Sequence, residues 1–291
     1  MNRRYVIPII LLIFAGIFLS FSYFHPHFDS SLTRCIDQGY IIIGYSIEPP
    51  YAYIDNSEIT GESPEVAREI VRRLGISNII WRQTEFGSLI SELEAGKIDV
   101  IASGMFITEA RKEQIAFSLP SIHVLQGLLV KKGNPHNIHS YRQAFQNMDV
   151  SIAVLSGSVE ELIFRELGMS EDRLIHVPDA ISGLASVETG KIDGFALSSP
   201  PIRWIEKHNP SRMVEQAYPF DQTDISKSII SGNGAFGFRK SDKKLLDAWN
   251  EQMILYIGSE EHQELVRQFG IMKEELPDYH SQQYGSEKTL L

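Results

Sequence analysis

The alternation of hydrophobic and polar positions follows the same course at two places in the chain. Residues 93–102 (LEAGKIDVIA) and 187–196 (VETGKIDGFA) each run from the end of an amphipathic helix, through a glycine stop, into a buried strand. One such junction is ordinary, but its repetition predicts two α/β lobes of similar build. Because small molecules bind in clefts between such units, the pattern indicates a cleft that holds a ligand.

The first lobe is predicted to contain strands and helices in the order βαβαβ. Its strands are expected at residues 40–45, 78–81 and 98–102, and its helices at 63–74 and 86–95. Ser63 is the expected N-cap of the first helix, with Pro64 in the first turn and Gly75 as the stop. This order is typical of a largely parallel sheet.

The same theme restarts after residue 135 and predicts a second lobe. Its strands are expected at 150–154, 174–177 and 192–197, and its helices at 157–167, directly after Asp179, and at 200–208. A strand over 229–238 then crosses back, followed by helices over 241–256 and 259–269. Residues 273–291 are polar and aperiodic, so we expect little order there.

These predictions divide the chain into five parts. Residues 1–24 carry two arginines and then an apolar run, the pattern of a signal peptide. The alternative is an uncleaved membrane anchor, because the run is nearly long enough to span a bilayer. The remaining parts are lobe 1 (36–129), lobe 2 (130–230), a return segment of lobe 1 (231–272) and a polar tail (273–291).

Composition and charge exclude several kinds of partner and cofactor. The formal net charge is −10 and no basic stripe offsets it, so nucleic acid is not an expected partner. Cys35 is the only cysteine, so the chain has no disulfide framework of its own. The nine histidines are scattered, so no metal site is expected. Residues 232–237 match GxGxxG but precede a strand-like stretch instead of opening a helix, so no dinucleotide cofactor is expected.

Five side chains of lobe 1 follow the ends of predicted strands, where ligands bind in open α/β sheets. Glu48 and Tyr51 follow the first strand, Phe86 the second, and Phe106 and Arg111 the third. The fork of an arginine suits a carboxylate, and aromatic faces suit a cationic or apolar group. Taken singly, an arginine after a turn such as Arg111 is usually a solvated surface charge, and single aromatic rings are more often core; their joint placement at three strand ends favours a site.

Lobe 2 offers a helix start, Gly157-Ser158-Val159-Glu160, after its first predicted strand. The exposed amides and the helix dipole at such a start favour an anion. Glu160 has two interpretations, a ligand-binding residue or an ordinary first-turn charge. Asp179 is likewise either a ligand-binding residue or the cap of the helix that follows it.

These segments, in this order, resemble family 3 of the extracellular solute-binding proteins, the receptors of bacterial polar amino-acid ABC importers. The resemblance rests on Thr108-x-x-Arg111, the two Gly-x-Ile-Asp strands, Phe117-Ser-x-Pro120 and the Gly157-Ser158 helix start. It implies an α/β, two-lobed periplasmic-binding-protein fold of type II, with two crossovers that form a hinge. It also implies a monomeric, periplasmic receptor with no catalytic residues, whose partners are one small ligand and the permease subunits of the importer.

Finer motifs resemble one branch of this family, the ectoine/hydroxyectoine-binding proteins. These motifs are Glu48-Pro-Pro-Tyr51, residues 64–70, Glu85-Phe-Gly87, Gly104-Met-Phe106, residues 131–135 and Val177-Pro-Asp179. The resemblance implies that Arg111 holds the carboxylate of a zwitterionic ligand. It further implies that three aromatic rings surround the ligand's cationic ring and that acidic groups balance its charge. These roles fall to Tyr51, Phe86 and Phe106, and to Glu48 and Glu160.

Two positions depart from the family's pattern. Ordinary amino-acid receptors carry an aspartate where this chain has Ser198, and that aspartate holds the α-amino group of the ligand. Its absence would cost an α-ammonium group roughly 1.5–3 kcal/mol, which argues against a standard α-amino acid. At Val159 the relatives usually carry a hydroxyl that binds the carboxylate, so the ectoine assignment lacks one expected contact.

Two other functions stay open at this point. The chain could be a periplasmic lyase similar to cyclohexadienyl dehydratases, with Glu48 or Glu160 as the acid, because an aromatic pocket raises the pKa of a carboxyl group. It could also be a sensor that keeps its N-terminal run as an anchor and signals to a membrane partner. We expect a receptor instead of an enzyme, because no set of residues in the sequence demands catalysis.

Overall fold

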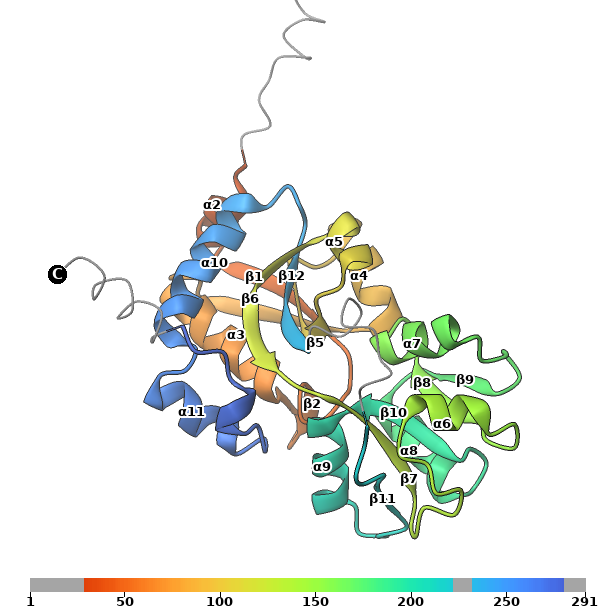
Figure 1. Ribbon diagram of the computed structural model, residues 1–291. Helices are drawn as coiled ribbons and strands as arrows, with labels where there is room; N and C mark the ends of the chain where they lie inside the picture. The colour runs from red at the N-terminus through yellow and green to blue at the C-terminus, as the bar shows by residue number, and fades with distance from the viewer. Residues whose placement is uncertain (1–28, 222–231, 280–291) are drawn as a thin grey trace, which may run out of the picture.

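Two five-stranded sheets organise the chain, one in each lobe (Figure 1). The computed structural model describes residues 29–221 and 232–279. The first sheet has the order β4 (Asn78–Gln83), β1 (Tyr40–Tyr45), β5 (Val100–Phe106), β12 (Asn233–Phe238) and β6 (Ala116–His123). Strand β1 is parallel to β4 and β5, whereas β12 is antiparallel to β5 and β6.

The second sheet repeats this plan. Its order is β11 (Val214–Gln216), β7 (Gln126–Lys131), β10 (Gly194–Ser198), β8 (Ile152–Leu155) and β9 (Leu174–Val177). Strand β8 is parallel to β10 and β9, and β7 is antiparallel to β10 and β11. Three parallel strands are therefore extended by antiparallel ones in both sheets, which confirms the predicted α/β fold with two lobes of similar build. A separate hairpin is formed by β2 (Tyr53–Asp55) and β3 (Glu58–Thr60).

Helices flank both sheets (Figure 1). Lobe 1 carries α2 (Ser31–Gln38), α3 (Glu62–Arg73), η1 (Phe86–Ser88), α4 (Leu89–Glu94), α5 (Glu109–Gln114), α10 (Lys243–Tyr256), α11 (Glu260–Arg267) and η2 (Lys273–Glu275). Lobe 2 carries α6 (Tyr141–Gln146), α7 (Val159–Leu167), α8 (Ala180–Glu188) and α9 (Ser199–His208). Trp249 of α10 is fully buried, and its ring packs against Phe236 and Phe238 of β12 with centroids 5.1 and 5.5 Å apart.

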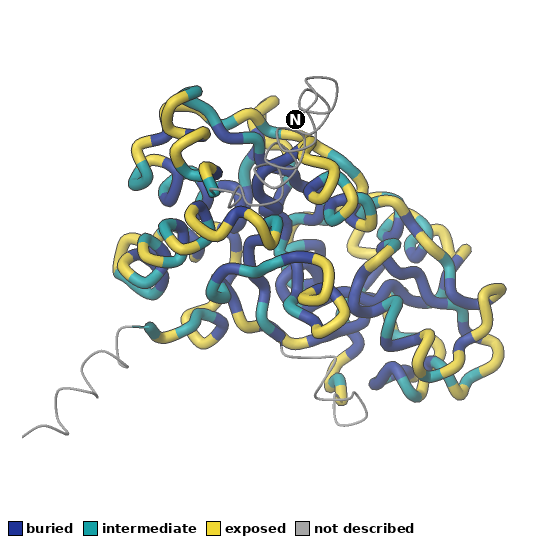
Figure 2. The backbone as a smooth tube through the Cα atoms, turned by 90° about the horizontal axis from the view of Figure 1, so that it is seen from above, coloured by how far each residue is buried: buried dark blue, intermediate teal, exposed yellow. Residues whose placement is uncertain are grey.

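The apolar core continues from one lobe into the other. One cluster of buried residues includes Trp249 in lobe 1 and Phe164 in lobe 2, with Tyr51, Phe106 and Val159 also in it. Figure 2 shows buried segments throughout both halves of the molecule. Because the last three residues lie where the lobes face each other, the two lobes are in direct contact in this structure.

The chain passes between the sheets at the hinge. Strand β6 ends at His123 and β7 begins at Gln126, so the first crossover lies at residues 124 and 125, ahead of the expected division after 129. The amide of Val124 donates a hydrogen bond to the carbonyl oxygen of Gly232 at 2.7 Å. This bond holds the outgoing chain beside the returning chain. The predicted start of the returning strand, residues 229–231, lies outside the described residues.

The predicted polar tail is described in part, up to residue 279, whereas the predicted signal peptide or anchor is not described. Residues 273–279 are more ordered than expected, because η2 packs against β6 and the Tyr279 hydroxyl donates to the Pro120 carbonyl oxygen at 2.8 Å. The rest of the predicted tail and the predicted signal peptide or anchor, residues 1–24, lie outside the described residues. Among the helices that the structure describes, none combines the length and the apolar character needed to cross a bilayer.

The repeated Gly-Lys-Ile-Asp motif has the same structural task in both lobes. In lobe 1 the Asp99 carboxylate accepts a hydrogen bond from the Ile42 amide of β1 at 3.0 Å. In lobe 2 the Asp193 carboxylate accepts one from the Ser151 amide, just before β8, at 2.8 Å. Each aspartate therefore ties the segment in front of a central strand to the neighbouring parallel strand.

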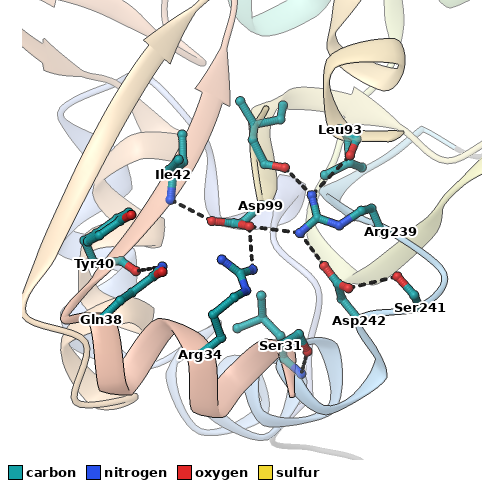
Figure 3. A network of polar contacts seen from close by, with 12 residues as sticks. Ser31, Arg34, Gln38, Tyr40, Ile42, Leu93, Asp99, Arg239, Ser241 and Asp242 are labelled. Carbon is teal, nitrogen blue, oxygen red and sulfur yellow. Dashed lines mark hydrogen bonds and ion pairs between the residues drawn. The ribbon is translucent and has the colours of Figure 1, made fainter. Parts of the chain in front are cut away.

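In lobe 1 the Asp99 carboxylate also forms ion pairs with two guanidinium groups (Figure 3). Asp99 pairs with Arg34 of α2 at 2.7 Å and with Arg239, which follows β12, at 2.9 Å. Burial alone would raise the pKa of Asp99, but the hydrogen bonds from Arg34, the Ile42 amide and Arg239 outweigh it and lower the pKa. The network therefore fixes α2 and the end of β12 to the start of β5.

We expect Asp99→Asn to lower the free energy of unfolding by about 3 kcal/mol. This value is at the lower end of the range for breaking a buried ion pair, because the Arg34 side chain is partly exposed. Urea unfolding at neutral pH measures the loss. Asp193→Asn is the control, because Asp193 bonds Ser151 and the His136 ring but no arginine; it should cost about 1 kcal/mol, the value of an ordinary hydrogen bond. Equal losses in the two variants would contradict the role given to the arginine pair.

Candidate functional site

The turn after β1 carries the first two candidate residues. The amide of Tyr51 donates to the Glu48 carbonyl oxygen at 2.9 Å, which closes the turn. The start of α3 supports it from behind, because the amides of Glu62 and Ser63 donate to the carbonyl oxygens of Pro50 and Tyr51 at 2.9 and 3.0 Å. The turn is thereby held so that Glu48 and Tyr51 are both buried.

Helix α3 begins earlier than predicted, and this difference shapes the site. Gly61, not Ser63, precedes the first turn, with φ of 123°. A Cβ at Gly61 would lie 2.5 Å from the Tyr51 carbonyl oxygen, so glycine is required for the turn and the helix to approach this closely. The Ser63 hydroxyl instead accepts a hydrogen bond from the Gly104 amide at 3.1 Å. Gly104 in turn lies against the Tyr51 ring, where a Cβ would be 2.6 Å from Cγ.

Two further strand ends complete the lobe 1 side. Phe86 opens η1 after β4, and Phe106 ends β5. The Thr108 hydroxyl accepts a hydrogen bond from the Arg111 amide at 3.2 Å, which caps α5. The Arg111 side chain turns inward: its Nη1 donates to the Phe106 carbonyl oxygen at 2.6 Å, and its Cζ lies 5.5 Å from the centroid of the Phe86 ring.

The lobe 2 side is built by the first turn of α7. The Ser158 hydroxyl accepts a hydrogen bond from the Glu161 amide at 3.2 Å and so caps the helix. Val159 and Glu160, the first helical residues, are buried in the space between the lobes. A helix thus starts here as predicted, with its first residue at Val159, two residues after the expected start at 157.

These elements enclose one small cavity of about 20 Å³ between the lobes. It is lined by Glu48, Tyr51, Phe86, Gly104, Phe106, Arg111, Leu155, Ser158, Val159, Glu160 and Ser198. Such a volume is close to that of a single water molecule. The structure is therefore a closed form, in which the walls of the site almost meet.

Direct contacts across the cavity hold the lobes together. The Tyr51 hydroxyl lies 2.8 Å from the Ser198 hydroxyl oxygen. Nη2 of Arg111 donates to the Gly157 carbonyl oxygen at 2.8 Å. A Cβ added to Gly157 would lie 2.9 Å from the Gly87 Cα, so the two backbones touch at these glycines.

Arg111 is the cation of the cavity. It is 8% exposed, and no ion pair among the described residues joins it to a carboxylate. Burial lowers its pKa to about 10, opposed by the charge of Glu160. Its two hydrogen bonds to carbonyl oxygens use two of the five N–H groups, so the guanidinium retains donors for a carboxylate that enters the cavity.

Two carboxyl groups face the same space. Burial, and then the charge of Glu160, raises the pKa of Glu48 to about 8. Burial raises the pKa of Glu160 to about 7, against hydrogen bonds from its own amide and from Ser158 and against the charge of Arg111. Both carboxylates are thus destabilised by desolvation, and a cation between them would stabilise the ionised forms.

The structure brings together most of the predicted site. Eight of the ten predicted ligand-binding residues line the cavity, and Gly157 reaches it through its carbonyl contact with Arg111. Asp179 does not line it: its carboxylate accepts a hydrogen bond from the Ser182 amide at 2.8 Å, so it caps α8, the alternative interpretation.

Three lining residues were not among the predicted ligand-binding residues. Leu155 and Ser198 end β8 and β10, so the rule that ligands lie at strand ends could have found both. Gly104 has no side chain that could bind a ligand; a glycine is needed at this position because the Tyr51 ring occupies the space that a Cβ would fill. Within residues 29–221 and 232–279, no three His, Cys, Asp or Glu side chains are grouped so that they could hold a metal ion.

Two lobes that close over a small charged cavity define a solute-binding protein. The sequence matches bacterial extracellular solute-binding proteins, family 3, over residues 41–271, and the chain belongs to this family. It is 34% identical over 242 residues to a probable amino-acid ABC transporter periplasmic-binding protein of Sinorhizobium fredii, a match that covers 82% of this chain and 79% of the relative.

Solved structures agree with the predicted type II fold. The crystal structure of EhuB in complex with hydroxyectoine superposes with a TM-score of 0.76 at 29% identity, covering 84% of this chain and 94% of EhuB. A mutant of ArgBP from T. maritima gives a TM-score of 0.71 at 25% identity, covering 82% and 98%. The type II periplasmic-binding-protein fold is therefore confirmed.

We expect Gly157→Ala to hinder closure, because its Cβ would meet the Gly87 backbone of the other lobe. Gly168→Ala is the matched control: both glycines have positive φ, 77° and 86°, but nothing lies within 4 Å of a Cβ at Gly168. The two variants should unfold at similar urea concentrations. With a ligand found by the screen proposed below, Gly157→Ala should bind at least about tenfold more weakly, or 1.4 kcal/mol, and Gly168→Ala as wild type. Equal affinities would contradict the closure contact.

Proposed function

We propose that the protein is the periplasmic receptor of an ABC importer, which captures a small zwitterionic solute by lobe closure and delivers it to the permease. The observation that carries this proposal is the buried guanidinium of Arg111. It lies between two lobes, has no carboxylate partner among the described residues, and shares its cavity with two carboxyl groups. A ligand with one anionic and one cationic group would satisfy both kinds of group at once.

The roles of the cavity residues follow from their chemistry. Arg111 receives the carboxylate of the solute through the donors that its carbonyl contacts leave available. Tyr51, Phe86 and Phe106 offer aromatic faces to the cationic part, with Glu48 as its nearest acid. Glu160 adds a second acid from lobe 2, so that the lobes approach the solute from both sides.

The ligand class that we propose is an ectoine-like compatible solute or an amino-acid derivative. The similarity to EhuB, solved with hydroxyectoine, supports the first. The Ser198 hydroxyl is engaged with the Tyr51 hydroxyl and offers an α-ammonium group no carboxylate, which argues against a standard α-amino acid. Val159 presents no hydroxyl to the ligand's carboxylate, so Arg111 is the main side chain that binds this carboxylate.

Closure would follow from the same contacts. In the open form Arg111 of lobe 1 and the α7 start of lobe 2 are apart, and a carboxylate on Arg111 is drawn toward the α7 amides by the helix dipole. Closing then adds the bond from Arg111 to the Gly157 carbonyl oxygen and the contact between Tyr51 and Ser198. The ligand therefore favours a closed form in which both lobes contact it, somewhat wider than the water-sized cavity of this structure.

Location and assembly belong to the same proposal. A cleaved signal peptide would release a monomeric receptor into the periplasm, whereas an uncleaved run would hold the receptor, or a sensor, at the membrane. N-terminal sequencing of the exported protein distinguishes a cleaved from an anchored chain.

A second candidate is a lyase on the same fold, favoured by the raised pKa values of Glu48 and Glu160, since a protonated carboxyl group can serve as a general acid. Incubation with prephenate should yield no phenylpyruvate above the uncatalysed rate if the protein is a receptor. Phenylpyruvate formation that is lost in Glu48→Gln or Glu160→Gln would establish the lyase.

Arg111→Ala should weaken solute binding by roughly 2–5 kcal/mol, because it removes the cation from a buried charge pair. A thermal-shift screen over ectoine, hydroxyectoine, betaines and the common amino acids identifies the ligand, and isothermal titration measures the loss. Arg72→Ala is the control, since the side chain of that α3 arginine is 69% exposed and does not line the cavity. Unchanged affinity in Arg111→Ala, or no binding of any solute by wild type, would refute the proposed site.

A further inference from the structure

The closed cavity holds an unequal number of acidic and basic groups. Glu48, Glu160 and Arg111 are 7%, 6% and 8% exposed, so all three are removed from water. They line the same space of about 20 Å³. With both carboxyl groups ionised, the cavity would enclose two negative charges and one positive charge, and an uncompensated buried charge is strongly unfavourable.

The other titratable groups around the pair do not correct this imbalance. Tyr51, from the turn after β1, lines the cavity together with Glu48, and the charge of Glu160 acts on Tyr141 of α6. Burial raises the pKa of both phenols well above the ordinary value, so both stay neutral. Glu62, whose amide donates to the Pro50 carbonyl oxygen, is fully buried, which raises the pKa of its carboxyl group, and it does not line the cavity. Within the described residues the balancing cation is therefore the Arg111 guanidinium.

The two carboxyl groups differ in how they are supported. Its own amide, the Ser158 side chain and the charge of Arg111 lower the pKa of Glu160 against the larger effect of burial. Glu48 has no side-chain hydrogen bond among the described residues, and its neighbour in charge is Glu160. Because the two carboxyl groups interact, they titrate as a pair. The state with one proton on the pair is the one that the guanidinium neutralises.

We infer that closure over a solute with a single cationic group leaves one proton on the Glu48–Glu160 pair, so that capture of such a solute takes up a proton from solution. This inference rests on the proposed function, since it assumes an open receptor that closes over a zwitterion. A zwitterion brings equal positive and negative charge, so it leaves the imbalance of the cavity unchanged. It further takes both carboxyl groups to face water in the open form and to be ionised there at neutral pH, as ordinary glutamates are.

The proton balance is simple. On closure one carboxylate accepts a proton from the buffer acid and becomes a carboxyl group, and nothing is oxidised or reduced. The closed complex then binds one more proton than the open receptor. Affinity is therefore highest near the ordinary pKa of a glutamate, and it falls as the pH rises through neutrality, where the retained proton becomes harder to supply.

Isothermal titration in two buffers tests the inference directly. Ectoine, hydroxyectoine and glycine betaine, which each carry one cationic group, are titrated into the full chain at pH 7 in phosphate and in Tris. The dependence of the binding enthalpy on the ionisation enthalpy of the buffer gives the number of protons exchanged. We expect an uptake close to one proton per bound solute, and a dissociation constant that rises by up to about tenfold per pH unit between pH 6 and pH 8.

Two variants assign the proton to the pair. Glu48→Gln and Glu160→Gln each leave one carboxyl group, which the guanidinium can balance, so the uptake should fall to near zero and the pH dependence should flatten. Glu85→Gln is the matched control, because Glu85 is exposed and adjoins Phe86 in sequence but does not line the cavity. This control should take up as much proton as wild type.

The outcomes separate the inference from the proposed function. Binding of a probe with no proton uptake would overturn the inference and leave the receptor function standing. Uptake that persists unchanged in both Glu48→Gln and Glu160→Gln would also overturn it. Failure of every probe to bind would overturn the proposed ligand class and this inference with it.

Discussion

The placement of a guanidinium without a carboxylate partner inside a closed interlobe cavity is the constraint on which the site depends. Arg111 is held there by two carbonyl oxygens, one from each lobe: that of Phe106 at 2.6 Å and that of Gly157 at 2.8 Å. Buried charges persist in proteins when they are paired or when function requires them. A cation held in this way, opposite two destabilised carboxyl groups, is the basis of the proposed preference for a ligand that carries both signs of charge.

The fold supplies the rigidity that this arrangement needs. The repeated aspartates fix the start of a central strand in each lobe, and the cavity residues follow the opposite ends of such strands. Glycines then allow backbones to approach: Gly61 and Gly104 let α3 and β5 crowd the Tyr51 turn, and Gly157 lets α7 touch η1. The absence of a side chain at these glycines is thus as necessary to the site as the charged groups are.

The sequence predicted the long elements and the strand ends well, and the short elements poorly. Strands β1 and β9 have the predicted bounds and Asp179 caps α8, because alternation and capping act locally. Helices α5 and α6, of six residues each, and the hairpin β2–β3 were missed because they are too short to show a period, and α2, β6 and β7 were missed as well. The start of α3 at Glu62 depends on a contact with the Tyr51 turn. Likewise, the bond between Tyr51 and Ser198 depends on how far the lobes close, which no local pattern encodes.

A crystal structure with the solute selected by the screen tests the central claim most directly. The account predicts that the solute's carboxylate lies on the Arg111 guanidinium, with N–O distances of about 2.7–2.9 Å. It also predicts the solute's cationic group among Tyr51, Phe86 and Phe106, within reach of Glu48. A solute bound outside this cavity, or bound within it with its cationic group toward Arg111, would contradict the account.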